Sequence, residues 1–207
     1  MIIGITGKIG TGKSTVGEYL RQKGLTVIDC DQIVHELYEP GGAGTEKIRS
    51  FFAETYLDKR GGVNRKKLFR MLLKSPKKWE VMNRMIHPLV AEELRRRLAP
   101  PRRWLRKINT KNDKRRILVA LEIQIYTPKL FNEFVDELWV LESPKEAQYK
   151  RLIPRNLEAK IIDQLNRLQR SDIHEKTIRI PNNGTLAELF DAIEKQLKRL
   201  TQFPIME

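Results

Sequence analysis

GKIGTGKS, residues 7–14, is the stretch of sequence that decides the fold, because it matches the pattern G-x-x-x-x-G-K-[ST] in full. Three glycines, at positions 7, 10 and 12, allow the backbone to adopt positive φ and to approach a ligand without a Cβ clash. An apolar run, residues 1–6, precedes this loop, and a helix is expected from about residue 13 to 23. A strand, a glycine-rich loop and a helix in this order direct backbone N–H groups and the positive end of the helix at a phosphate.

The polar side chains of the loop suit a nucleoside triphosphate. Lys13 is expected to reach the β- and γ-phosphates as a point charge, and the Ser14 hydroxyl is expected to ligate Mg²⁺. The alternative, a strand–helix turn without a ligand, is disfavoured because the match is complete and lies between a strand and a helix. The residues of this loop expected to bind the nucleotide are Gly7, Lys8, Ile9, Gly10, Thr11, Gly12, Lys13, Ser14 and Thr15.

Hydrophobic patterning predicts an α/β protein. Apolar runs at 25–29, 117–123 and 137–141, with a shorter one near 177–180, are expected to add four strands to the first. Helices separate most of these strands, which favours right-handed parallel crossovers. The fold class is therefore a P-loop NTPase fold, with a parallel five-stranded sheet and helices on both faces.

One domain is expected, with two additions to its core. The core should comprise about residues 1–38 and 115–207, and a helical substrate-binding insertion should occupy about 39–114. A short lid is expected at about 150–172. Within the insertion, Ser75-Pro76 predicts the start of a long helix, which Pro88 should break or kink near His87.

Two capping boxes are expected to start helices near the end of the chain. Ser143 with Glu146 predicts a helix that Pro154 ends, and Thr185 with Glu188 predicts the final helix, about 186–200.

Composition limits the class of protein. The chain has 207 residues and one cysteine, Cys30, so an internal disulfide is excluded and a reducing, cytoplasmic setting is expected. No run of about 18 apolar residues is present, so no membrane partner is expected. The three histidines lie far apart without cysteine neighbours, which disfavours a zinc site.

The formal net charge of +14 is concentrated in one segment. Residues 95–116 contain eleven Lys or Arg and one acid, Asp113. A solvated surface is the simplest interpretation, and a site for an anionic ligand or for nucleic acid is the alternative. Nucleic acid is disfavoured as a partner because the segment has no recognisable reading motif and Trp104 is its single aromatic residue.

Two carboxylates follow the second expected strand. Asp29 and Asp31 flank Cys30 where that strand ends, and ligands of open parallel sheets bind at this edge. A carboxylate there can contact an acceptor hydroxyl near the γ-phosphate. Alternatively, each of the two aspartates is a helix N-cap, because Asp31 precedes a helical stretch, and Cys30 is more simply a small core residue.

The order of these motifs resembles the dephospho-CoA kinase family over almost the whole chain. The resemblance rests on several short patterns beyond the glycine-rich loop. They are Asp29-Cys30-Asp31, Pro40-Gly41, Gly62 followed by Arg65, Ile86-His87-Pro88, Gln148 with Arg151 and Arg155, Gln169, and Asn182-Asn183-Gly184.

The resemblance implies ATP-dependent phosphorylation of the ribose 3′-hydroxyl of dephospho-CoA, giving coenzyme A and ADP. It implies that Asp31 is the general base and that Lys13 is catalytic. Arg151 and Arg155 resemble lid arginines that neutralise the transferring phosphoryl group, one of them being catalytic. The remaining implied contacts are Asn182 to the adenine of ATP, and Arg65 and His87, with Asp31, to dephospho-CoA. The partners are then ATP and dephospho-CoA, and a monomer or weak homo-oligomer is expected.

The sequence departs from the family pattern in places. Glu122–Tyr126 stands where the family often has Pro-Leu-Leu-Phe-Glu, so the wall of the acceptor pocket differs. Lys8 replaces a frequent glycine, and His35 replaces the usual arginine after Asp31. The alternative function is a kinase of the same architecture that acts on another small metabolite or a nucleoside monophosphate.

Overall fold

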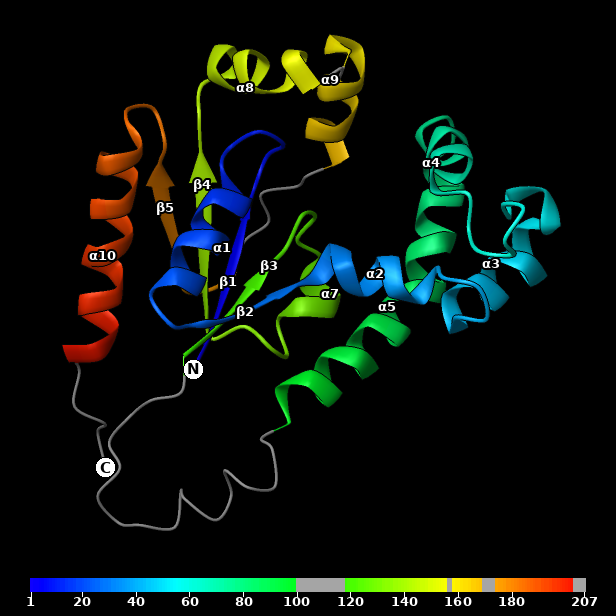
Figure 1. Cartoon of the computed structure of the whole chain (residues 1–207), viewed down its shortest axis with the longest axis horizontal. Coiled ribbons are helices and arrows are strands. Elements are labelled where there is room, and N and C mark those ends of the chain that lie inside the picture. The colour runs from blue at the N-terminus through cyan, green and yellow to red at the C-terminus, as the bar shows by residue number, and fades with distance from the viewer. Residues whose placement is uncertain (100–117, 156–157, 169–173, 203–207) are drawn as a thin grey trace. The chain divides into compact units, whose positions relative to one another are not determined.

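A computed structural model describes residues 1–99, 118–155, 158–168 and 174–202 (Figure 1). The chain forms two compact units, one of Met1–Asp29 with Arg115–Glu207 and the other Cys30–Lys114. The second unit begins earlier than the insertion expected from about residue 39. Most of the basic segment 95–116, as well as Gln169, lies outside the described residues.

The first unit, called here the sheet unit, contains five parallel strands in the order β2-β3-β1-β4-β5. This arrangement confirms the predicted sheet, because each expected apolar run forms a strand. The strands are β1 (Ile2–Gly7), β2 (Thr26–Asp29), β3 (Val119–Glu122), β4 (Glu137–Glu142) and β5 (Thr177–Pro181).

One face of this sheet is covered by the first and last helices, α1 (Lys13–Gln22) and α10 (Leu186–Gln202). Their apolar residues share one buried cluster with alternate residues of the strands. Its fully buried members include Ile3, Ile5, Val16, Leu20, Trp139 and Ile193. On the opposite face, a Cβ added to Gly4 would lie 2.9 Å from the Leu138 side chain and 3.1 Å from Val135. The segment after the short helix α7 (Pro128–Phe131) therefore packs on that second face.

The other helices of the sheet unit follow β4. They are α8 (Lys145–Leu152), a 3₁₀ turn at Ile153–Arg155, and α9 (Ala159–Leu168). The capping box expected at Ser143 is wrong: α8 has no side-chain cap, and Ser143 Oγ instead donates to the Asn182 carbonyl at 2.8 Å.

The capping box at the start of α10 is confirmed. The Thr185 backbone N–H donates to Glu188 Oε2 at 2.7 Å, and the Glu188 N–H donates to Thr185 Oγ1 at 3.3 Å. Two backbone donors that the helix itself cannot satisfy thus find partners.

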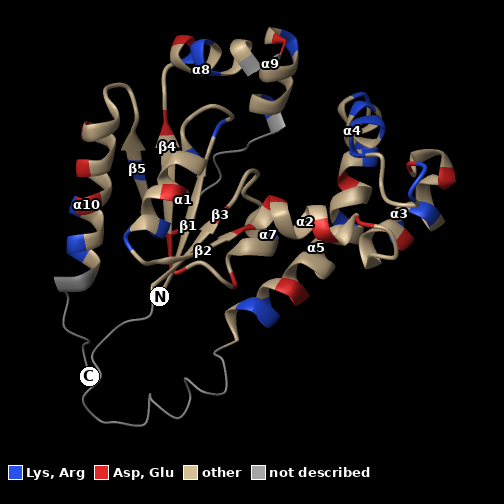
Figure 2. Cartoon of the chain, in the orientation of Figure 1, with Lys and Arg blue, Asp and Glu red and all other residues tan. Residues whose placement is uncertain are grey.

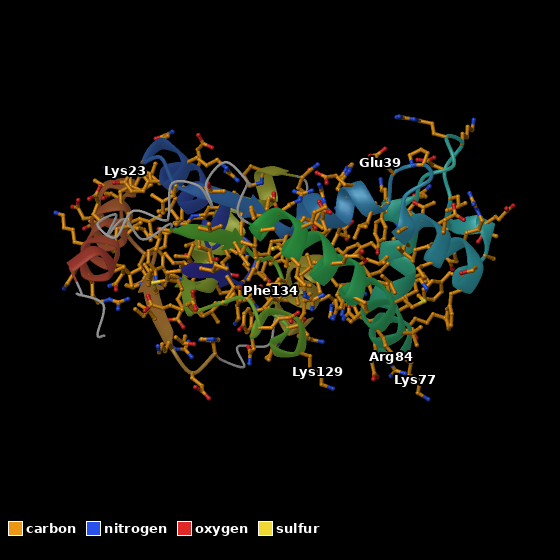
Figure 3. The ribbon with its side chains drawn as sticks, turned by 90° about the horizontal axis from the view of Figure 1, so that it is seen from below. Lys23, Glu39, Lys77, Arg84, Lys129 and Phe134 are labelled. Atoms are coloured by element: carbon orange, nitrogen blue, oxygen red, sulfur yellow. The ribbon has the colours of Figure 1, made fainter. Side chains whose placement is uncertain are left out.

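The second unit, called here the helical unit, contains four α-helices among its described residues. They are α2 (Cys30–Leu37), α3 (Ala43–Phe52), α4 (Arg65–Leu73) and α5 (Pro76–Leu98), with a 3₁₀ turn at Glu54–Tyr56. Lys and Arg residues are frequent along α4 (Figure 2), and all of them are exposed. Lys77 and Arg84 project from α5 (Figure 3).

The long helix α5 begins as predicted but does not break. Ser75 Oγ accepts from the Lys78 N–H at 3.4 Å, with Pro76 in the first turn. The helix continues through Pro88, so of the two outcomes expected near His87, a break or a kink, the break does not occur. Proline removes one backbone hydrogen bond, whereas residues on both sides of it, among them Ile86 and Val90, are buried and hold the helix in place.

None of the helices in the four described ranges combines the length and the apolar character that crossing a bilayer requires.

Candidate functional site

The glycine-rich loop between β1 and α1 has the positive φ angles that its glycines predict. Gly7, Gly10 and Gly12 have φ of 147°, 78° and 97°. A Cβ on Gly12 would lie 2.6 Å from Asn182 Nδ2, and a Cβ on Gly7 would lie 2.4 Å from the Leu141 carbonyl oxygen. Both the dihedral angles and the close neighbours therefore require glycine.

The Lys13 ammonium is held across this loop. Its Nζ donates to the carbonyls of Gly7 at 2.8 Å and Lys8 at 3.1 Å, and the residue is 9% exposed. Burial lowers the pKa of Lys13 to about 8, while the nearby Glu122 carboxylate opposes that shift. A buried cation beside an array of backbone N–H groups is suited to bind phosphate oxygens.

Ser14 and Glu122 place two side-chain oxygens next to each other beside the loop. Ser14 Oγ donates to Glu122 Oε1 at 2.6 Å, and Glu122, the last residue of β3, is 8% exposed. A Cβ on Gly17 of α1 would lie 2.8 Å from Glu122 Oε2, so the carboxylate occupies the space that this glycine leaves. A hydroxyl and a carboxylate are the hard oxygen donors that Mg²⁺ prefers, so these residues fit the metal.

Glu122 was not predicted as a site residue, although its position carried a signal. An acid at the end of a nearly continuous apolar strand lies at the same sheet edge as the loop, because parallel strands end together. The register confirms this, since Glu122 aligns with Ile5 of β1.

The structure brings Arg151 and Asn182 to the same loop. Arg151 Nη1 donates to the Gly10 carbonyl and to Ser143 Oγ, both at 3.0 Å, and its Nη2 donates to the Asn182 carbonyl at 3.3 Å. The Asn182 side chain, 5% exposed, donates to the Thr11 carbonyl at 2.9 Å. The segments after β4 and β5 are thus joined to the glycine-rich loop.

Gln148 extends this network into α9. Its Nε2 donates to the Ser143 carbonyl at 2.9 Å, and its Oε1 accepts from Asn166 Nδ2 at 3.0 Å. Arg155, the second expected arginine, ends the 3₁₀ turn after α8, and its side chain lies outside the described part of the structure.

In the helical unit, the structure brings Asp31 and Arg65 together. Arg65 Nη2 lies 3.3 Å from Asp31 Oδ2, and these side chains are 43% and 50% exposed. Asp31 lies within the first turn of α2, so the interpretation that it precedes and caps this helix is wrong. Arg65 begins α4, which Asn64 caps by accepting from the Lys67 N–H at 3.0 Å.

A cavity of about 390 Å³ adjoins Arg65 in the same unit. It is also lined by His35, Tyr38, Arg60 and Asn64. Burial raises the pKa of the Tyr38 hydroxyl well above its ordinary value, so this side chain stays neutral and can donate a hydrogen bond. The charges of the lining are balanced, because Glu39 and Asp58 accompany the two arginines, so the cavity can hold a polar ligand.

His87, the third residue expected on the acceptor side, lies in the middle of α5. Burial lowers the pKa of its imidazole, which favours the neutral form. His87 is not among the residues that line the cavity beside Arg65.

Comparison with known proteins shows which family the chain belongs to. The family model described as dephospho-CoA kinase matches residues 1–188. A dephospho-CoA kinase of Streptococcus mutans is 31% identical, over 96% of this chain and 97% of its own, and one of Fusobacterium nucleatum is 34% identical, over 94% and 96%. The structure of a dephospho-CoA kinase from Campylobacter jejuni superposes with a TM-score of 0.61 over 97% of both chains. At 20% identity, this last likeness concerns the fold alone.

Proposed function

Because the chain belongs to the dephospho-CoA kinase family, we propose that it transfers the γ-phosphoryl group of ATP to the ribose 3′-hydroxyl of dephospho-CoA, giving coenzyme A and ADP. The observation that carries the proposal is the complete phosphate loop, with a buried Lys13 and a Ser14–Glu122 pair, in a chain whose family match spans residues 1–188. The same match disfavours another metabolite as acceptor.

On the nucleotide side, the loop would hold the phosphates and Lys13 would neutralise charge on the β- and γ-phosphates. Ser14 would ligate Mg²⁺ with Glu122 behind it, and the metal would supply further charge neutralisation. Asn182 would border the adenine site, because its side chain and carbonyl already fix the loop through Thr11 and Arg151. Little covalent help is needed, since positioning and electrostatics provide most of the catalysis in phosphoryl transfer.

On the acceptor side, Asp31 would accept the proton of the 3′-hydroxyl as it attacks. One residue, Cys30, separates it along the chain from the end of β2, and Arg65 holds its carboxylate by an ion pair. Arg65 and His87 would contact dephospho-CoA. Arg151 and Arg155, at the start of the proposed lid at about 150–172, would neutralise charge and help to exclude water.

A coupled assay for ADP release tests the reaction. ADP should form in proportion to added dephospho-CoA, with coenzyme A identified by mass spectrometry. AMP, shikimate and gluconate are assayed in the same way, as acceptors that the alternative function would use. Release of ADP with one of these and none with dephospho-CoA would refute the proposal.

The remaining parts of the proposal concern setting and assembly. The proposed substrates are soluble metabolites and the chain has one cysteine, which suits a reducing cytoplasm. We propose a monomer or weak homo-oligomer, and sedimentation at several concentrations would measure it.

A further inference from the structure

A second, larger cavity lies in the sheet unit, on the face opposite α1 and α10. Its volume is about 590 Å³. Thr6, Val140 and Arg179 are neighbours across β1, β4 and β5, and all three line it. Trp139 is adjacent to Val140 and points into the core beneath α1 and α10, so alternation along β4 places Val140 on the other face.

The floor of this cavity is apolar and firmly packed. Leu138, Val140 and Tyr126 contribute to it. Tyr126 stacks on Phe131 with ring centroids 5.7 Å apart, and its hydroxyl donates to Asn132 Oδ1 at 2.6 Å. A preformed apolar surface of this size can bind the body of a small ligand.

The lining of the cavity has more cations than carboxylates. Two of its four cations are paired: Arg179 with Glu142, and Lys145 with Asp163 at 3.1 Å. The other two are Lys8, whose side chain is exposed, and Arg167, whose positive charge helps to lower the pKa of the Asp163 carboxyl. These two cations are available for an anion.

Asn166, which also lines the cavity, has a buried acceptor. Asn166 Oδ1 is buried and has no hydrogen-bond partner among the described residues, whereas its Nδ2 donates to Gln148. An unpaired buried carbonyl oxygen is unfavourable, and a ligand N–H would relieve that cost. The ligand should therefore combine negative charge, an apolar body and an amide-type donor.

The cavity adjoins the phosphate loop, because Gly7, Lys8 and Thr11 form part of its lining. A ligand within it would have one end close to the nucleotide's phosphates. We propose that this cavity binds the pyrophosphate–pantetheine arm of the acceptor, an inference that rests on the proposed function. Lys8 and Arg167 contact the pyrophosphate, the apolar floor contacts the arm, and Asn166 Oδ1 accepts from an amide N–H of the arm.

Steady-state kinetics with Arg167→Ala test this assignment. The KM for dephospho-CoA should rise about tenfold or more, the scale of one lost charged hydrogen bond, whereas kcat and the KM for ATP should stay within about twofold of wild type. Arg167→Lys should restore part of the affinity. Lys160→Ala is the matched control, because it removes one exposed cation from the same helix without touching the cavity.

Competition with 4′-phosphopantetheine provides a second measurement, since this molecule carries the arm and one phosphate without adenosine. It should inhibit wild type competitively against dephospho-CoA, and more weakly in Arg167→Ala. An unchanged KM for dephospho-CoA in Arg167→Ala, or a rise confined to the KM for ATP, would overturn the cavity assignment while leaving the reaction intact. Absence of turnover with dephospho-CoA in wild type would overturn both.

Discussion

The nucleotide side of the sheet unit and the acceptor side of the helical unit differ in how firmly their polar side chains are held. Lys13, Glu122 and Asn182 are buried and hydrogen-bonded, two of them to partners more than 100 residues away in the sequence. Asp31 and Arg65 are about half exposed and meet at 3.3 Å. The phosphate site is thus organised before any ligand binds, whereas the acceptor is expected to complete its own site.

Removing the positive charge of Lys13 from the nucleotide side should have the largest effect on kcat. Lys13→Met keeps the length of the side chain and loses the cation, so kcat should fall about 10³-fold, as for a lost electrostatic contact to the transition state. Stopped-flow or steady-state ADP release measures it. A fall of less than tenfold would mean that the pre-arranged cation is not used in catalysis.

The next largest effect on kcat should come from Asp31, on the acceptor side. Asp31→Asn should lower kcat about 10²-fold, the scale of a lost general base, while the affinity for ATP stays unchanged. Asp31→Glu should recover part of the rate, and Asp29→Asn is the control for the neighbouring carboxylate. An unchanged kcat would remove Asp31 from its proposed role.

Glu122→Gln tests whether the buried carboxylate serves the metal. The Mg²⁺ concentration for half-maximal activity should rise about tenfold or more, as for other residues that support a metal ligand. Titration of activity with Mg²⁺ at saturating ATP measures the shift. An equal loss of activity at all Mg²⁺ concentrations would indicate a purely structural role.

The pH dependence of ATP binding should report the buried lysine. Burial lowers the pKa of Lys13 from 10.5 to about 8, so the free enzyme loses this charge at lower pH than the unfolded chain. Affinity for ATP should therefore fall about tenfold per pH unit above about pH 8, because only the protonated form attracts phosphate. Between about 8 and 10.5 the unfolded chain binds more protons, so the contribution of this group to stability rises with pH.

Lys13→Arg is the control for that measurement. The reference pKa of arginine is about 12.5 or above, so this side chain stays charged from pH 7 to 10. Whatever the affinity of Lys13→Arg for ATP, that affinity should therefore not change with pH over this range. Calorimetric titration with ATP gives both profiles, and parallel slopes would assign the pH dependence to another group.

The smallest effect should come from Thr185→Ala, far along the chain from the loop. Loss of the capping box should lower the free energy of unfolding by about 1 kcal/mol and leave kcat unchanged. Thermal unfolding should shift by about 2–4 °C, with Ser50→Ala as a surface control. A change in kcat would show that the start of α10 takes part in catalysis.

The strands, the phosphate loop and the order of the helices could be predicted because their signals are local. Apolar runs, glycine spacing and the Thr185–Glu188 box each depend on residues a few positions apart. Ser143 shows where this reasoning fails: its hydroxyl has a competing partner in Asn182, 39 residues away, and that contact replaces the expected cap.

Large separation along the sequence also limits the prediction of the site. Ser14 and Glu122 are 108 residues apart, and no local sequence pattern predicts the hydrogen bond between their side chains. The ion pair between Asp31 and Arg65 spans 34 residues and depends on how α2 and α4 each pack against α5. Residue type identified Lys13, Ser14 and Asp31, but which side chains support them depends on tertiary contacts.

Gly17 shows why a helix can carry a residue other than the one that would make it most stable. Alanine in the middle of a helix is normally more stable than glycine by about 1 kcal/mol, yet a methyl group here would meet the Glu122 carboxylate at 2.8 Å. A substitution chosen to make the enzyme more heat-resistant would thus push aside the acid behind Ser14. At Gly17 the stability of α1 and the position of the Glu122 carboxylate therefore oppose each other, and engineering for one should be checked against the other.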